Sequence, residues 1–147
     1  MKTISDIIKD QVPCSVAKDQ TVFEVARYMT DCQVGAVPVV EGDRILGIFS
    51  ERDLMTRVVV KELDPKSTPV GDVMTTDVVV IDTNESYENC IRKMKQLNCR
   101  HLPVVSQDRK LIGVISLRDL LWLDKMEKEE ELKMLNEYVY GVPVAAT

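Results

Sequence analysis

The sequence contains two copies of one unit, and this internal repeat limits the folds open to the chain. The stretch 47–53 reads GIFSERD, and the stretch 113–119 reads GVISLRD. The similarity extends further, because residues 36–55 align with residues 101–121 once one residue is inserted in the turn between two strands. A duplicated unit predicts two similar substructures that pack against each other.

Each copy is predicted to contain a short lead-in helix, a strand, a helix, a hairpin and another helix. Apolar residues recur at helical spacing over 22–29 and again over 87–94. Thr21 and Ser86 stand where these helices begin, and Thr21 forms a capping-box pattern with Glu24. The hairpins are expected to turn at EGDR in the first copy and at SQDR in the second.

These elements predict an α+β fold of two β-α-β-β-α repeats related by a pseudo-two-fold axis, with an added C-terminal helix. One such repeat cannot bury both faces of its small sheet, so we expect the two repeats to pack together. The predicted boundaries are repeat 1 over 1–62, a linker over 63–70, repeat 2 over 71–124, a C-terminal helix over 125–141 and a tail over 142–147.

Composition and charge argue against several classes of protein. The net charge of −5 over 147 residues is unlike the clustered basic surface that nucleic acids require. Apolar runs such as residues 78–81 are far too short to span a bilayer. The first ten residues alternate charged and apolar side chains, unlike a signal peptide. We therefore expect a cytoplasmic protein that binds neither nucleic acid nor membrane.

The four cysteines are scattered and predict free thiols. Cys14, Cys32, Cys90 and Cys99 form no C-x-x-C pair, and most are expected to act as small core residues. Cys99 and His101 make only a C-x-H fragment, whereas zinc sites use four ligands in recognisable pairs. No metal site is expected.

The repeated serine and aspartate have a structural and a functional interpretation. Ser50 and Ser116 each follow a strand and precede an apolar-periodic stretch, so each is a good helix N-cap with Asp53 or Asp119 as its reciprocal partner. The same helix start offers free N–H groups to a phosphate, and a carboxylate one turn on suits the hydroxyls of a ribose. Capping does not require the arginine that both copies carry.

The two copies resemble a tandem pair of cystathionine-β-synthase (CBS) domains, the Bateman module. The resemblance rests on VPVV with LGIFSERDLM in the first copy, LPVV with IGVISLRDLL in the second, and the entry segment VMTTDVVVIDTNES. It covers residues 3–122, and RHLPV and LNEYVYG further resemble small stand-alone CBS pairs. The resemblance implies an adenosyl ligand such as AMP, ADP, ATP, NAD or S-adenosylmethionine in clefts between the repeats, with no cofactor required.

The resemblance also assigns roles by position. In each copy the aspartate would bind ribose, the serine would face ribose or phosphate, and the arginine at the cleft rim could touch phosphate. These residues are Ser50, Arg52 and Asp53 in the first copy and Ser116, Arg118 and Asp119 in the second.

The residues before the repeated proline differ between the copies. Arg100 and His101 precede Pro103, in a place where CBS domains often carry phosphate-binding cations, whereas the first copy has the uncharged stretch 35–37 there. If only one phosphate pocket is strong, it should contain Arg100 and His101. Adenine is expected to lie on the strand entering a repeat, which includes Val78 and Val80 in the second copy and residues 14–17 in the first.

The sequence therefore favours a regulatory module that senses adenine nucleotides, without catalysis, and that forms a homodimer with two-fold symmetry. The alternative is a constitutive CBS-pair dimer that acts as an interaction scaffold with empty clefts. An enzyme ranks third. Ser116, His101 and Asp119 could be drawn as a triad, but no nucleophile elbow is present and capping already uses the serine and the aspartate.

Overall fold

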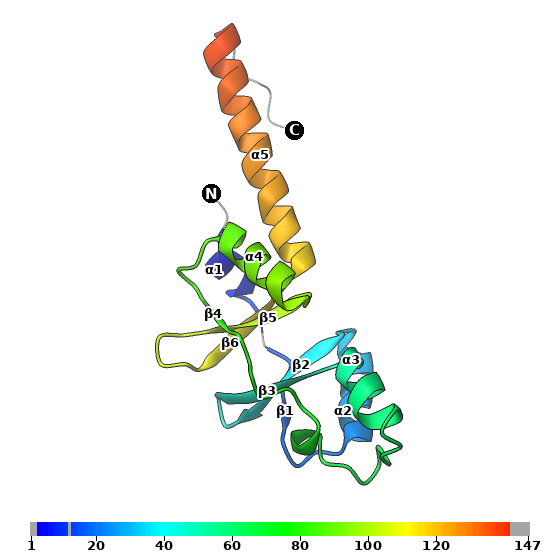
Figure 1. The fold of residues 1–147 in the computed structure, drawn as a ribbon. Helices are drawn as coiled ribbons and strands as arrows, with labels where there is room; N and C mark the ends of the chain where they lie inside the picture. The colour runs from blue at the N-terminus through cyan, green and yellow to red at the C-terminus, as the bar shows by residue number, and fades with distance from the viewer. Residues whose placement is uncertain (1–2, 12, 142–147) are drawn as a thin grey trace.

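A computed structural model describes residues 3–11 and 13–141 (Figure 1). The first repeat consists of α1 (Ile4–Ile8), β1 (Val16–Ala17), α2 (Val22–Cys32), β2 (Ala36–Glu41), β3 (Arg44–Ser50), α3 (Glu51–Asp53) and the π-helix η1 (Leu54–Val59). The second consists of the 3-10 helix η2 (Val70–Asp72), β4 (Ile81–Asp82), α4 (Tyr87–Leu97), β5 (His101–Val105), β6 (Leu111–Ser116) and α5 (Leu117–Tyr140).

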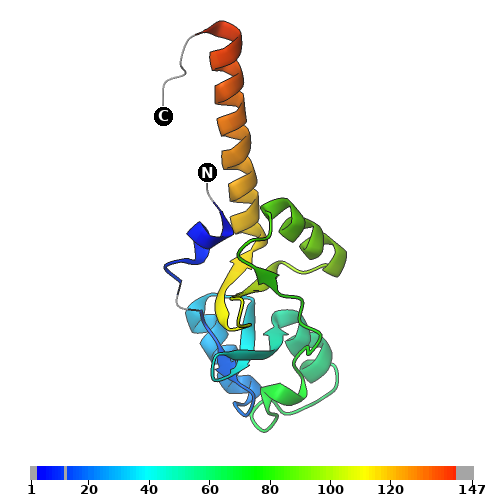
Figure 2. The same cartoon turned by 90° about the vertical axis from the view of Figure 1, so that its left-hand side faces the viewer.

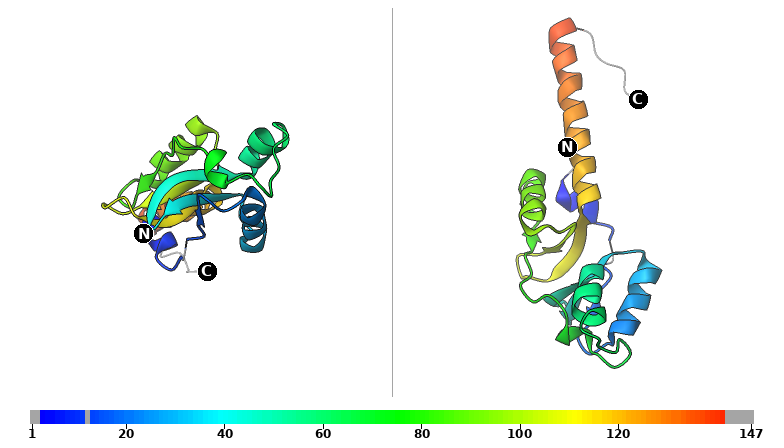
Figure 3. Two further views of the ribbon diagram at one scale, coloured as in Figure 1. Left: turned by 90° about the horizontal axis from the view of Figure 1, so that it is seen from below. Right: turned by 45° about the vertical axis from the view of Figure 1, so that its right-hand side comes forward.

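The two repeats have the same sheet topology, which confirms the predicted α+β fold. The strand orders are β1-β2-β3 and β4-β5-β6, and in each sheet a parallel pair is followed by an antiparallel hairpin. Both hairpins carry an irregularity at the same place, after Val39 and after Val104. The sheets lie side by side at the centre of the molecule (Figure 3). Leu111 N–H donates to the Asp43 carbonyl at 3.0 Å, which joins the hairpin of one repeat to that of the other.

The repeats exchange their lead-in segments. Helix α1 is the first element of repeat 1 in the sequence, but its residues Ile4 and Ile8 are buried in the core of the second repeat, with Ile81 and Leu120. Conversely, Val70 and Val73 come from the first element of repeat 2 and the residue that follows it, but they lie in the core of the first repeat with Val25 and Phe49. The predicted boundaries at 62 and 71 therefore separate segments that pack together.

The helix caps follow the sequence closely. Ser50 and Ser116 each form a complete capping box with the aspartate three residues later. Thr21 accepts a hydrogen bond from the Glu24 backbone N–H at 3.2 Å, and Ser86 caps α4 in the same way. These side chains satisfy N–H groups that a helix start leaves without partners, so they fix where each strand gives way to a helix.

Three predicted elements differ from the structure. The sequence predicts a strand that includes residues 78–80, but β4 contains only Ile81 and Asp82, the two residues that pair with β5. After Asp53 the α-helical geometry changes to the wider π-helix η1. The helices predicted on either side of residue 125 form one continuous helix, α5, which ends at Gly141 with φ of 65° as its C-cap. The predicted tail over 142–147 lies outside the described residues.

Helix α5 extends far beyond the body of the protein (Figure 2). Its first turns pack into the second repeat through Leu120 and Leu123, whereas Leu132, Leu135 and Val139 are exposed. Within the described residues, no helix combines the length and the apolar character needed to cross a bilayer.

Candidate functional site

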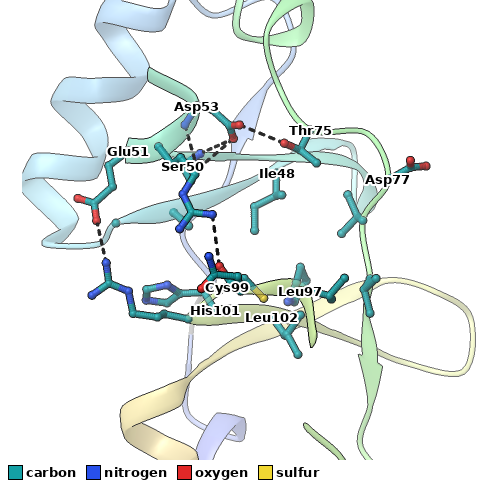
Figure 4. A pocket seen from close by; sticks show the side chains of 18 residues that line it. Ile48, Ser50, Glu51, Asp53, Thr75, Asp77, Leu97, Cys99, His101 and Leu102 are labelled. Atoms are coloured by element: carbon teal, nitrogen blue, oxygen red, sulfur yellow. Dashed lines mark hydrogen bonds and ion pairs between the residues drawn. The ribbon is translucent and has the colours of Figure 1, made fainter. Parts of the chain in front are cut away.

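A cavity of about 290 Å³ lies between the two repeats (Figure 4). One wall is the end of β3 with α3, and the opposite wall is the turn before β5 with the start of that strand. The segment 75–79 closes one side, held to β3 by two backbone hydrogen bonds between Ile48 and Thr75, at 2.8 and 2.9 Å. Both repeats therefore contribute to this cavity, which is close to the smallest size usual for a small-molecule site.

Asp53 is the buried charged group of the first wall, with only 7% of its surface exposed. Its Oδ2 accepts hydrogen bonds from Ser50 N at 3.0 Å and Ser50 Oγ at 3.1 Å. Its Oδ1 accepts one from Thr75 Oγ1 at 3.1 Å and lies 3.5 Å from Arg57 Nε. A carboxylate oxygen accepts two hydrogen bonds, and Oδ2 already has two from Ser50, so a ligand hydroxyl would bind Oδ1, beside or in place of the Thr75 hydroxyl.

Two contacts cross the cavity mouth from the first repeat to the second. Arg52 Nη1 donates to the Asn98 carbonyl at 3.4 Å. Arg100 Nη2 lies 3.8 Å from Glu51 Oε1, and both of these side chains are largely exposed. An exposed ion pair such as Arg100–Glu51 contributes little to stability, so a ligand can replace this pair at small cost.

His101 lies at the base of the second wall and points into the cavity (Figure 4). Burial lowers its pKa below the usual 6.5, and the positive charge of Arg100 lowers the pKa further, against the opposite effects of Glu51 and Asp119. The imidazole is therefore neutral at pH 7. It offers a phosphate a hydrogen bond rather than a full positive charge.

The second copy of the motif keeps the cap, but its serine and aspartate do not line the cavity described above. Asp119 Oδ2 accepts from Ser116 N at 3.0 Å, and Asp119 N–H donates to Ser116 Oγ at 3.1 Å. Gln11 occupies the position that Thr75 has in the first copy, since its Oε1 accepts from Val114 N–H at 3.1 Å as the Thr75 carbonyl accepts from Ile48. The duplicated motif thus has two different surroundings.

Some of the site residues predicted from the sequence line the cavity, and others do not. Those that line it are Ser50, Arg52, Asp53, Val78, Arg100, His101 and Pro103. Those outside its lining are Val80, Ser116, Arg118 and Asp119. Arg100 and His101 thus face the serine and aspartate of the first copy, across the boundary between the repeats.

Sequence reasoning missed several residues of the lining. Glu51 occupies a variable position inside the repeated motif, which gave no reason to select it. Thr75 and Asp77 lie in the entry segment VMTTDVVV, whose polar residues were available as a signal. Asn98 and Cys99 come from the turn before β5. Among the described residues, no three His, Cys, Asp or Glu side chains cluster closely enough to hold a metal ion.

Comparison with known families agrees with the duplicated architecture. The family model of the CBS domain matches residues 4–60 and again residues 70–124. The chain belongs to the CBS-domain family. The cavity lining takes residues within 35–53 from the first matched range and residues within 75–103 from the second, so the cavity of this CBS-domain chain lies between its two CBS domains.

Relatives are known from a plant and a bacterium. The chain is 32% identical to the mitochondrial CBS domain-containing protein CBSX3 of Arabidopsis thaliana, over 95% of this chain and 72% of that protein. It is 37% identical to the CBS domain-containing protein YhcV of Bacillus subtilis, over 82% of this chain and 84% of the relative.

Solved structures show the same fold. The CBS-domain protein ATU1752 of Agrobacterium tumefaciens superposes with a TM-score of 0.76 at 28% identity, over 84% of this chain and 99% of that one. The CBS-domain protein PAE2072 of Pyrobaculum aerophilum, solved in complex with AMP, superposes with a TM-score of 0.72 at 26% identity, over 80% and 89% of the two chains.

Proposed function

We propose that this CBS-domain chain is a regulatory module that binds an adenosyl nucleotide in the cavity between its repeats and performs no chemistry on it. The observation that carries the proposal is the buried Asp53 carboxylate, held by Ser50 and Thr75 beside a cavity whose far wall carries Arg100 and His101. This pairs a fixed acceptor for sugar hydroxyls with donors for a phosphate.

Each part of a nucleotide has a matching part of the lining. In the proposed binding mode adenine lies against the apolar side chains of Ile48, Val78 and Val79, the last two of which belong to segment 75–79. The ribose hydroxyls reach Asp53, where a ligand hydroxyl can join or replace the Thr75 hydroxyl on Oδ1. The phosphate is placed at the mouth, near Arg52 and Arg100. The AMP complex of the Pyrobaculum relative supports this class of ligand.

The proposed module is a homodimer. Support comes from large apolar side chains that remain exposed along and just after η1 and on α5, a surface that a second copy of the chain would cover. These side chains are Met55, Val59, Val60, Leu121, Trp122, Leu132, Leu135 and Val139. A nucleotide bound between the repeats regulates the dimer if it binds one arrangement of the repeats more tightly than another.

Thermal unfolding with millimolar adenosine, AMP, ATP and NAD⁺ tests the proposal. Binding to the folded state alone raises the melting temperature, so at least one of these ligands is expected to do so in the wild type. Asp53→Ala is expected to lose that rise. If none of the four ligands shifts the wild-type melting temperature, the nucleotide-binding proposal is wrong.

A second candidate is a constitutive scaffold whose clefts stay empty, and the long exposed part of α5 favours it. In that case the melting temperature is insensitive to all four ligands, while removal of the apolar residues of α5 abolishes assembly. The same thermal experiment therefore separates the two candidates.

A further inference from the structure

The charged side chains lining the cavity are unusual for a site that is to hold several phosphates. Two of them are guanidinium groups, on Arg52 and Arg100, and three are carboxylates, on Glu51, Asp53 and Asp77. Asp53 is directed to the sugar in the proposed binding mode. Asp77 belongs to segment 75–79, on the adenine side of the cavity, whereas Glu51 lies beside Arg100, where the phosphates would lie (Figure 4).

Glu51 is the acidic group closest to the proposed phosphate position. Its Oε1 lies 3.8 Å from Arg100 Nη2, so a phosphate that reaches Arg100 also meets Glu51. The Glu51 side chain lies over Gly35, where an added Cβ would be only 3.2 Å from Oε1. The carboxylate thus lies across the mouth, along the edge between the two walls.

The fold itself does not require a carboxylate at this position. Glu51 N–H donates to the Gly35 carbonyl at 2.9 Å, and in the second repeat Leu117 N–H donates to the Arg100 carbonyl at 2.8 Å. The two residues have the same backbone role, and Leu117 fills it without charge. The negative charge of Glu51 is therefore free to act on a ligand.

We propose that Glu51 makes the cavity selective for adenosyl ligands with one phosphate over those with three. The inference rests on the proposed function and concerns the same site. A single phosphate carries about 1.5 to 2 negative charges at pH 7, which Arg52 and Arg100 balance once Glu51 turns away from Arg100. The additional phosphates of a triphosphate find no further arginine or lysine on the described lining and approach Glu51 instead.

Isothermal titration of adenosine, AMP and ATP, the last with and without Mg²⁺, tests this selectivity. The wild type is expected to bind AMP about tenfold more tightly than ATP at low salt. This affinity ratio should decrease as added salt screens the charges at the cavity mouth. Glu51→Gln is expected to strengthen ATP binding several-fold and to reduce the AMP/ATP ratio to about threefold, with adenosine affinity unchanged. Glu129→Gln removes the same charge from α5, far from the cavity, and is expected to behave as the wild type.

Each contrary outcome has a distinct meaning. Equal affinities of the wild type for AMP and ATP, or an unchanged ratio in Glu51→Gln, overturn the selectivity while the proposed nucleotide binding stands. Recovery of ATP affinity to the AMP level with Mg²⁺ also overturns it, because the carboxylates then help to hold a metal–phosphate complex. A wild type that binds none of the three ligands overturns the proposed function and, with it, the selectivity.

Discussion

At the scale of single residues, the two copies of Ser-x-x-Asp show that one motif can have two roles. Ser50 and Ser116 cap their helices with the same geometry. Asp53 is additionally bonded to Thr75 and lines the cavity, whereas the hydrogen bonds described for Asp119 are with Ser116. Capping and ligand binding are therefore compatible in the first copy, and the surroundings decide whether the second role is added.

The first prediction separates these roles. Asp53→Ala is expected to weaken AMP binding by 10-fold to 100-fold, because a buried charge-assisted partner of the ribose is lost. Asp119→Ala removes the matched aspartate and is expected to leave AMP affinity within about twofold. Each variant should lose about 1 kcal/mol of unfolding free energy from its helix cap. Calorimetric titration and urea unfolding measure the two effects, and equal loss of affinity in both variants would contradict the assignment.

The second prediction concerns pH and His101. The pKa of His101 in the folded state is below 6.5, mainly because the imidazole is buried. As pH falls, the unfolded chain therefore takes up a proton on His101 before the folded chain does. The stability from the neutral imidazole is therefore complete above about pH 6.5 and decreases as pH falls toward the folded pKa. His101→Gln should reduce the loss of stability between pH 7.5 and 5.5, measured by urea unfolding. If the free energy of unfolding of His101→Gln depends on pH as that of the wild type does, this prediction is wrong.

At the scale of secondary-structure elements, the sequence predicted most of the fold because the signals are local. Helical periodicity, capping serines and the polar hairpin turns all depend on residues close in sequence. The strand predicted at 78–80 was wrong because an apolar run forms a strand only where a neighbouring strand has room for it, and β5 pairs with just Ile81 and Asp82 there. The π-helix after Asp53 has no sequence signal that we can identify.

The third prediction tests the close approach of segment 75–79 to β3. An added Cβ at Gly47 would lie 2.6 Å from Met74 Sδ and 2.7 Å from the Thr75 carbonyl oxygen, which is backbone and cannot turn away. Gly47→Ala should lower the free energy of unfolding by about 1–3 kcal/mol. Gly35→Ala meets only the flexible Glu51 carboxylate and should cost clearly less. If urea unfolding shows that the two substitutions lower the free energy of unfolding equally, this packing argument is wrong.

At the scale of the whole molecule, the exchange of lead-in segments determines which residues meet. Helix α1 packs in the second repeat and Val70 in the first, so the repeats are interlocked rather than merely stacked. The sequence asymmetry at Arg100 and His101 indicated one distinctive phosphate pocket. It could not show that the opposite wall holds Ser50 and Asp53, because that contact depends on the packing of distant segments.

The fourth prediction concerns assembly. The wild type is expected to sediment as a dimer at micromolar concentration, because a stable interface would cover the exposed apolar side chains of η1. Met55 and Val59 lie one helical turn apart and are both more than half exposed, so Met55→Glu with Val59→Glu should shift the protein toward monomer. Thr56→Glu, on the same helix, is the control and should remain dimeric. A monomeric wild type would contradict the proposed assembly.

The position of a bound nucleotide tests the central claim most directly. A crystal structure of the protein with AMP should show the ribose hydroxyls within hydrogen-bond distance of the Asp53 carboxylate and the phosphate beside Arg100, with Glu51 moved off that guanidinium. AMP bound at Ser116 and Asp119 instead, with the cavity between Asp53 and Arg100 left to solvent, would contradict the account.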